Sequence, residues 1–139
     1  MNDIIVGVDR SSTARRAAET AASLAAACDG TLHLITCVKD GTDYDAAPSD
    51  RPGNFGSIAE AEQFLRVLEG ELPHARIVRS VELGDPATSM CEKAVQVGAD
   101  VIVVGNRRVQ GTSRVLGSIA ATTTRQAPCH VLVANTTCS

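Results

Sequence analysis

Aromatic side chains are nearly missing from this sequence. Its 139 residues include no tryptophan, one tyrosine and two phenylalanines, at positions Tyr44, Phe55 and Phe64. Proteins that bind single-stranded nucleic acid without sequence preference stack bases on aromatic rings, and three scattered rings cannot build such a platform. Hydrophobic residues still make up 44% of the chain. We therefore expect a single domain over residues 1–139, with a core of alanine, valine, isoleucine and leucine.

Positive charge is also in short supply. The 16 aspartates and glutamates outnumber the 13 lysines and arginines, which leaves a formal net charge of −3. Affinity for a phosphate backbone comes mainly from accumulated basic side chains, so we expect no nucleic-acid partner.

Signals for membrane insertion, export and metal binding are absent as well. No apolar run reaches the roughly 18 residues of a spanning helix, and the first residues lack the basic start and the cleavage site of a signal peptide. The five cysteines never stand in C-x-x-C spacing, which indicates free thiols. We expect a cytoplasmic protein with no membrane partner. No metal site is expected, because His33, His74 and His130 are scattered.

What the sequence does contain is a regular alternation of strand-forming and helix-forming segments. Short β-branched runs predict strands at residues 4–8, 31–38, 75–81, 101–104 and 129–134. Helical spacing predicts helices over residues 14–28, from 57 to before Pro73, from 86 to about 96, and from 114 or 117. This order predicts an α/β fold with a parallel sheet and helices on both faces, the 101–104 strand being central. Residues 39–56 are expected to form a long loop.

In open parallel sheets, ligands bind at the carboxyl ends of the strands. Asp9 ends the first strand, Cys37 and Val38 end the second, and Gly105 ends the fourth. Asp9 could accept hydrogen bonds from a ribose or a base, or it could cap the helix that follows. The residues alone leave both interpretations open.

The segment 105–118 leaves a strand and enters a helix. Gly105, Gly111 and Gly117 permit close approach of the backbone to a ligand. Free N–H groups at the helix start near Ser118 favour an anion, and Arg107, Arg108 and Arg114 add positive charge. These features suit a phosphate, although an ordinary loop with solvated arginines would look the same. Neither a Walker A loop nor the G-x-G-x-x-G fingerprint is present.

Three stretches together resemble a known family. They are I-I-V-G-V-D-R-S from residue 4, G-D-P-A at residues 84–87, and A-D-V-I-V-V-G-N-R-R…L-G-S…A-P-C-H-V-L-V between residues 99 and 133. The chain is similar over nearly its whole length to universal stress proteins of the UspA-like superfamily. The resemblance implies a Rossmann-like, five-stranded parallel sheet of the adenine-nucleotide alpha-hydrolase-like kind. It also implies homodimers paired through the last strand, here from Cys129 to Asn135.

One branch of that family binds ATP or a related adenine nucleotide, AMP or cAMP, in some cases with Mg²⁺, through the motif G-x2-G-x9-G-[ST]. Carried over, Gly105 matches the first glycine, and Gly117 with Ser118 matches the closing pair that holds phosphates. Asp9 matches the acidic residue near base and ribose, and Cys37 or Val38 falls where the backbone reads adenine. The nucleotide-binding residues implied are Val8, Asp9, Ser11, Cys37, Val38, Gly105, Arg107, Arg108, Gly111, Gly117 and Ser118.

The chain departs from the motif at two points. Arg108 stands at the second glycine, and the following spacer, residues 109–116, has eight residues in place of nine. Gly111 could restore part of the lost flexibility. Arg108 could block the path of the phosphates, or it could pair with them as a planar fork donor.

Two functions follow from this resemblance. One is a dimeric, adenine-nucleotide-binding regulator of the stress response, and the other is a dimeric stress or interaction protein that has lost nucleotide binding. No spacing of nucleophile and base suggests an enzyme, so slow ATP hydrolysis is the most we expect. A bound adenine would be held by backbone groups and aliphatic walls, unless Tyr44 or Phe55 folds in from the long loop.

Overall fold

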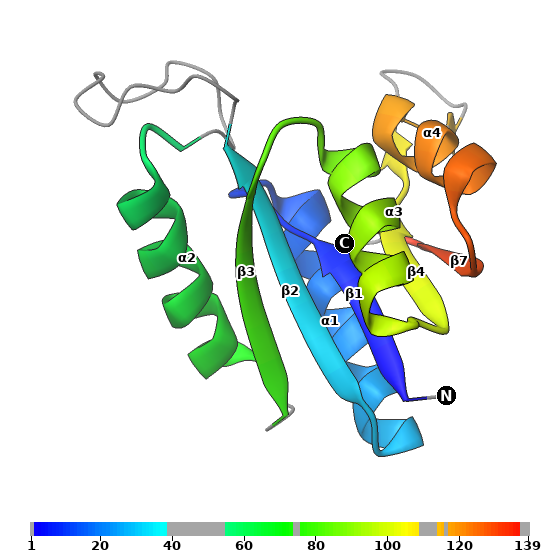
Figure 1. The fold of residues 1–139 in the computed structure, drawn as a ribbon, viewed down its shortest axis with the longest axis horizontal. Coiled ribbons are helices and arrows are strands. Elements are labelled where there is room, and N and C mark those ends of the chain that lie inside the picture. The colour runs from blue at the N-terminus through cyan, green and yellow to red at the C-terminus, as the bar shows by residue number, and fades with distance from the viewer. Residues whose placement is uncertain (1, 39–54, 74–75, 109–113, 116, 137–139) are drawn as a thin grey trace.

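A parallel sheet of five strands, in the order β3-β2-β1-β4-β7, forms the centre of the described chain (Figure 1). The structure is a computed structural model that describes residues 2–38, 55–73, 76–108, 114–115 and 117–136. The strands of this sheet are β1 (Asp3–Gly7), β2 (Thr31–Val38), β3 (Ile77–Leu83), β4 (Val101–Gly105) and β7 (His130–Ala134). The helices are α1 (Ser12–Cys28), α2 (Ile58–Glu71), α3 (Pro86–Val97) and α4 (Ser118–Gln126). The predicted α/β fold is confirmed, although the central strand is β1 and β4 lies beside it.

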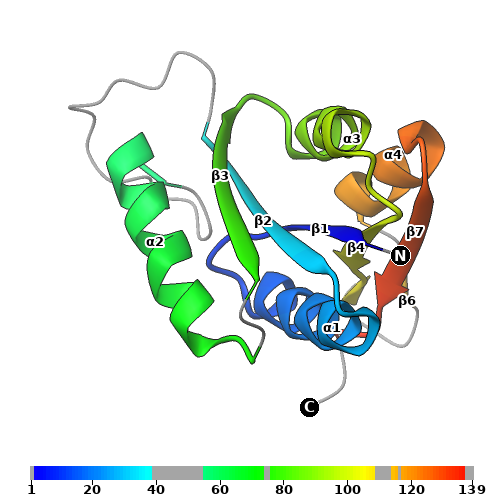
Figure 2. The same ribbon diagram turned by 60° about the horizontal axis from the view of Figure 1, so that its bottom comes forward.

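Helices cover both faces of the sheet (Figure 2). On one face α1 packs on β1 and β4, and α2 packs on β2 and β3. On the other face α3 packs on β1, β2 and β4, and α4 packs on β4 and β7. Because every strand of the sheet is parallel to its neighbours, all the carboxyl ends lie at one edge.

Side-chain caps start the helices where the sequence places hydroxyl and carboxyl groups. The Ser11 hydroxyl accepts a hydrogen bond from the N–H of Ala14 at 3.1 Å, which begins α1. The Asp85 carboxylate accepts from the N–H of Thr88 at 3.0 Å, and Pro86 occupies the first turn of α3. The left-handed Gly98, with φ of 65°, ends α3. The caps at Ser11 and Asp85 fix the starts of α1 and α3 at the edge that carries the carboxyl ends of the strands.

The core is aliphatic, as the composition predicts. One cluster lies between the sheet and the helices α1 and α2, and five alanines of α1 belong to it. A second cluster, around Ile5, Ile35, Met90 and Ile102, lies between the sheet and the helices α3 and α4. Small alanine side chains let α1 approach the sheet closely, so the fold needs few aromatic residues to fill space.

Some boundaries differ from the prediction. The third strand runs two residues later than expected, over Ile77–Leu83. The segment expected to be a simple polar loop contains a small antiparallel ribbon of β5 (Arg107–Arg108) and β6 (Arg114–Val115). Two-residue strands are too short to produce a hydrophobic period, so the sequence does not reveal them. None of the helices in the described part of the chain has the length and apolar character needed to cross a membrane.

Candidate functional site

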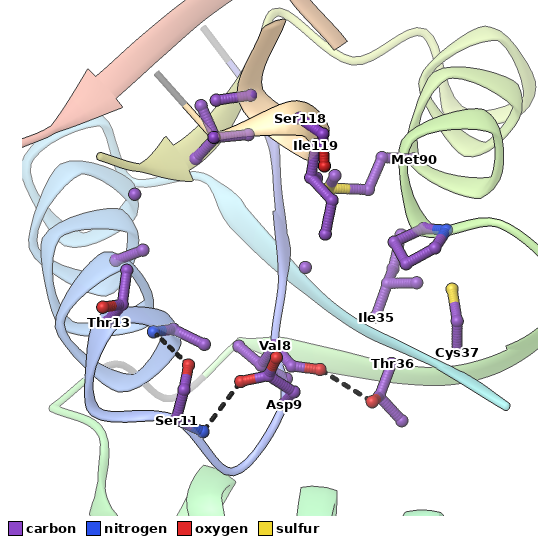
Figure 3. Close-up of a pocket in the computed structure, with 18 residues that line it drawn as sticks. Val8, Asp9, Ser11, Thr13, Ile35, Thr36, Cys37, Met90, Ser118 and Ile119 are labelled. Carbon is purple, nitrogen blue, oxygen red and sulfur yellow. Dashed lines mark hydrogen bonds between the residues drawn. The ribbon is translucent and has the colours of Figure 1, made fainter. Parts of the chain in front are cut away.

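A cavity of about 240 Å³ opens at the carboxyl ends of β1, β2 and β4 (Figure 3). The starts of α1, α3 and α4 surround the same space, as expected for an open parallel sheet. The lining residues are Gly7, Val8, Asp9, Ser11, Thr13, Ala14, Ala17, Ile35, Thr36, Cys37, Pro86, Met90, Val104, Gly105, Gly117, Ser118, Ile119 and Ala120.

Polar groups lie along the side of the cavity formed by the β1–α1 turn. The Asp9 carboxylate accepts a hydrogen bond from the N–H of Ser11 at 2.7 Å, while Ser11 itself caps α1. Asp9 is therefore not the helix cap. It shapes the turn with one oxygen and lines the cavity, which keeps a ligand-binding role open to it.

Apolar groups form the opposite side. Ile35 extends from β2, while Pro86 and Met90 come from the first turns of α3 (Figure 3). Gly7 allows this arrangement, because a β-carbon at that position would lie only 2.7 Å from the Met90 sulfur. The Thr36 hydroxyl donates to the Val8 carbonyl at 2.7 Å, so its polar group is satisfied within the wall. The cavity thus has an apolar end and a polar end.

Cys37 contributes a thiol to the apolar end. Burial raises the pKa of the Cys37 thiol, and a hydrogen bond with Ser89 opposes that rise. The thiol is therefore protonated near neutral pH, and it acts as a small neutral group beside Ile35 and Pro86.

The cavity lies at three helix N-termini, those of α1, α3 and α4. Unpaired N–H groups and the helix dipole make such positions favourable for anions. Gly117 occupies the N-cap of α4, and no side chain of the described residues caps that helix. Its first residues line the cavity, and no capping carboxylate or hydroxyl of the described residues occupies their N–H groups.

Gly105 lies where the sheet meets α1. A β-carbon at Gly105 would lie 2.8 Å from the Thr13 Cγ2 and 3.0 Å from the Thr136 Cγ2. Close packing therefore requires glycine at this position, in addition to any approach of the backbone to a ligand.

The basic loop that follows is only partly described. Arg107 pairs with Val115, and Arg108 pairs with Arg114, in the backbone register of the β5–β6 ribbon. Gly111 lies outside the described residues. The ribbon brings the three arginine positions together in the segment between Gly105 and Gly117, both of which line the cavity.

Val38 does not line the cavity, in contrast to its neighbour Cys37. Its side chain is buried against Phe55 and Ala61 beneath α2. Thr36, on the same face of β2 as Val38, does line the cavity, so the packing of Val38 under α2, and not the alternation of side chains, keeps it out. Phe55, the possible exception to aliphatic walls, does not fold into the cavity: its ring packs on Phe64 with centroids 5.0 Å apart. Tyr44 lies outside the described residues.

Other polar residues have structural partners. The His33 Nε2 lies 2.9 Å from the Asp3 Oδ1, and His33 is 8% exposed, so its ring is a buried group with a structural partner. Cys28, Cys37, Cys91 and Cys129 are unpaired thiols, while Cys138 lies outside the described residues. No group of three potential metal ligands comes together among the residues that the structure describes.

Reasoning from the sequence missed several lining residues, notably Thr13, Ile35, Pro86 and Met90. A usable signal existed for two of them. Thr13 and Pro86 each lie at a helix start that directly follows a strand, and such starts share the edge where ligands bind.

The universal stress protein family model matches residues 1–135 of the chain. The chain belongs to the universal stress protein family. A universal stress protein of Synechocystis is 32% identical over 134 residues, covering 94% of this chain and 83% of that relative.

Solved structures of the family share the fold. A universal stress protein in complex with cAMP superposes with a TM-score of 0.77 at 26% identity, covering 98% of each chain. A family member from Archaeoglobus fulgidus in complex with dAMP gives a TM-score of 0.73 at 21% identity, covering 96% of this chain and 97% of that one.

Proposed function

We propose that this universal stress protein is a dimeric regulator of the stress response that binds an adenine nucleotide. The observation that carries the proposal is the cavity, which combines an aliphatic wall at Ile35 and Met90 with the polar β1–α1 turn and the N-terminus of α4, which no described side chain caps. A nucleotide combines the same two kinds of group, because a flat base is joined through a sugar to an anionic phosphate. The bound cAMP and dAMP of the two relatives support the choice of adenine.

The base would occupy the apolar end, between Ile35 and Met90, where backbone groups at Cys37 would read its edge. Asp9 lines the cavity on the side of the β1–α1 turn, and its carboxylate would accept from ribose hydroxyls. The N–H groups at the start of α4, with the Ser118 hydroxyl, would donate to phosphate oxygens. With ATP, Mg²⁺ would bind chiefly to the phosphates, since it favours phosphate and carboxylate oxygens.

The volume of the cavity limits how much of a nucleotide it can enclose. The cavity, at about 240 Å³, is close to the lower end of ligand pockets, roughly 300 Å³. A base and sugar would be enclosed, and the phosphates would lie at the mouth near Gly117. The arginine positions of the β5–β6 ribbon belong to the loop beside that mouth.

Dimerisation would use the edge strand β7. Leu132 and Val133 on that strand are each 39% exposed, as is fitting for a strand that pairs with a partner. We further propose that the protein works in the cytoplasm by binding rather than by catalysis.

A purified sample tests the nucleotide proposal directly. Adenine absorbance released on denaturation, or a rise in melting temperature with ATP and Mg²⁺, AMP or cAMP, supports it. The absence of any shift at millimolar concentrations of all three would overturn it. The second candidate, a family member without nucleotide binding, would then stand, and Arg108 with its short spacer is the feature that favours it.

A further inference from the structure

Two segments that are far apart in the sequence are tied together behind Gly105. The N–H of Thr136, two residues beyond β7, donates to the Asn106 Oδ1 at 2.8 Å. The Thr136 hydroxyl donates to the Asn106 carbonyl and lies 3.0 Å from the same Oδ1. In return, the N–H of Asn106 donates to the carbonyl of Ala134 at 3.0 Å. We call Asn106 and Thr136, with these hydrogen bonds, the clasp.

The clasp lies directly behind one wall of the cavity. The space beside the Gly105 α-carbon is filled by methyl groups of Thr13 and Thr136, which leave no room for a side chain there. Gly105 and Thr13 line the cavity, whereas Thr136 does not and is only 6% exposed. Thr136 can therefore influence a ligand only indirectly, through neighbours such as Gly105 and Asn106.

We infer that Thr136 is a positioning residue for the phosphate end of the proposed nucleotide site. Asn106 is the first residue of the chain after β4, and the segment beginning there runs through the basic ribbon to Gly117 at the start of α4. By fixing the Asn106 backbone, Thr136 sets where that segment leaves the sheet. This inference rests on the proposed function.

The clasp acts on one end of the cavity only. Its residues follow β4 and β7, while the apolar end is built from β2 and α3, through Ile35, Pro86 and Met90. Loss of the Thr136 hydroxyl would leave the Asn106 carbonyl without its buried donor, and the backbone there would move to find another. A ligand that has only a base and a sugar should not respond to that movement, whereas a ligand with phosphates should.

The test compares adenosine with ATP in the full chain by isothermal titration calorimetry. Thr136→Val removes the hydroxyl and keeps the shape, and Thr136→Ser restores it. Thr123→Val is the matched control, because Thr123 is also buried and its hydroxyl donates to the Ile119 carbonyl of its own helix. We expect Thr136→Val to weaken ATP on the order of fivefold, with adenosine unchanged. Thr136→Ser and Thr123→Val should retain the wild-type ratio of the two affinities.

The outcomes separate this inference from the function on which it rests. Suppose that the wild-type protein binds ATP, and that Thr136→Val either lowers the affinities for ATP and adenosine equally or changes neither. The positioning role is then overturned and the nucleotide site stands. If the wild-type protein binds no adenine nucleotide, the proposed function is overturned and the positioning role falls with it. A lower melting temperature of Thr136→Val with an unchanged affinity ratio would mean that the clasp only stabilises the fold, which also overturns the inference.

Discussion

Thr13 leaves no room for a side chain at Gly105: a β-carbon there would lie 2.8 Å from the Thr13 Cγ2. The threonine is β-branched and lies in the first turn of α1, so its χ1 has little freedom to move aside. The contact joins the start of α1 to the end of β4 at the cavity wall.

Gly105→Ala should therefore destabilise the protein. We expect a loss of about 1–3 kcal/mol in the free energy of unfolding, as for other overpacked core sites. Urea denaturation followed by circular dichroism measures it. Gly70→Ala is the control, because nothing lies within 4 Å of a β-carbon built at that helical glycine. It should be neutral or stabilising by up to about 1 kcal/mol, and equal effects of the two changes would contradict the packing argument.

Gly117→Val should abolish nucleotide binding without unfolding the chain. Gly117 has φ of −66° and ψ of 165°, a conformation that valine adopts readily. The new side chain would cover the first N–H groups of α4. Loss of two hydrogen bonds to phosphate corresponds to a decrease in ATP affinity of roughly 100-fold. Calorimetry measures the affinity, and a wild-type value would remove Gly117 from the site; the dimer should persist in either case.

Arg108→Gly tests whether the arginine that stands at the second glycine of the family motif contributes to ATP binding. Arg108 stands at the second glycine of the motif, and a guanidinium can pair with phosphate oxygens as a planar fork donor. We therefore expect the glycine variant to bind ATP roughly tenfold more weakly. Adenosine affinity should not change. Tighter binding of ATP would instead mean that the arginine obstructs the phosphates.

Acid should reduce the contribution of Asp100 to stability. Its carboxylate accepts from the backbone N–H groups of Asn2, at 2.6 Å, and Asp3, at 3.3 Å. These bonds hold the pKa of Asp100 below its ordinary value of 3.8. The stabilisation is therefore fully present above that ordinary value and is lost as the pH falls through the lowered one.

Asp100→Asn should accordingly be less stable than wild type at pH values above about 4, and the difference should shrink toward about pH 2. Urea denaturation at several pH values measures the difference. A gap between the two proteins that stays constant across this range would show that the carboxylate charge is not involved.

Pairing of the proposed dimer through the edge strand β7 can be tested by placing a charge on that strand. Val133→Lys would place a charge on the proposed pairing surface, and we expect a monomer by size-exclusion chromatography with light scattering. Val78→Lys on the other edge strand, β3, is the matched control, because Val78 is also exposed, at 48%. A dimer that survives the first change, or dissociates with the second, would contradict pairing through β7.

Much of this structure can be predicted from the sequence, because each helix and strand is locally consistent. The alternation of β-branched runs with alanine-rich segments predicts the parallel sheet, and strand ends such as Asp9 then mark the cavity. The end of β2 is harder to predict. Cys37 lines the cavity whereas Val38 packs against Phe55 and Ala61, and this difference is set by contacts with residues distant in the sequence.

Lining residues from later in the chain could not be found by pattern alone. Met90 reaches the cavity because Gly7, on a different element, has no side chain. No local sequence pattern shows that these two residues are in contact. The same is true of the clasp, whose two residues are thirty positions apart.

The Phe55–Phe64 pair packs beneath the guanidinium of Arg10, 4.6 Å from the Phe55 centroid, and not against the cavity. With no tryptophan and a single tyrosine in the chain, the protein absorbs only weakly in the near ultraviolet. A purine bound between aliphatic walls would dominate the absorption spectrum of the complex. Neither phenylalanine lines the cavity, so among the described residues no aromatic ring would overlap the absorption of the purine. The ligand, rather than the protein, is thus the natural chromophore for following this site.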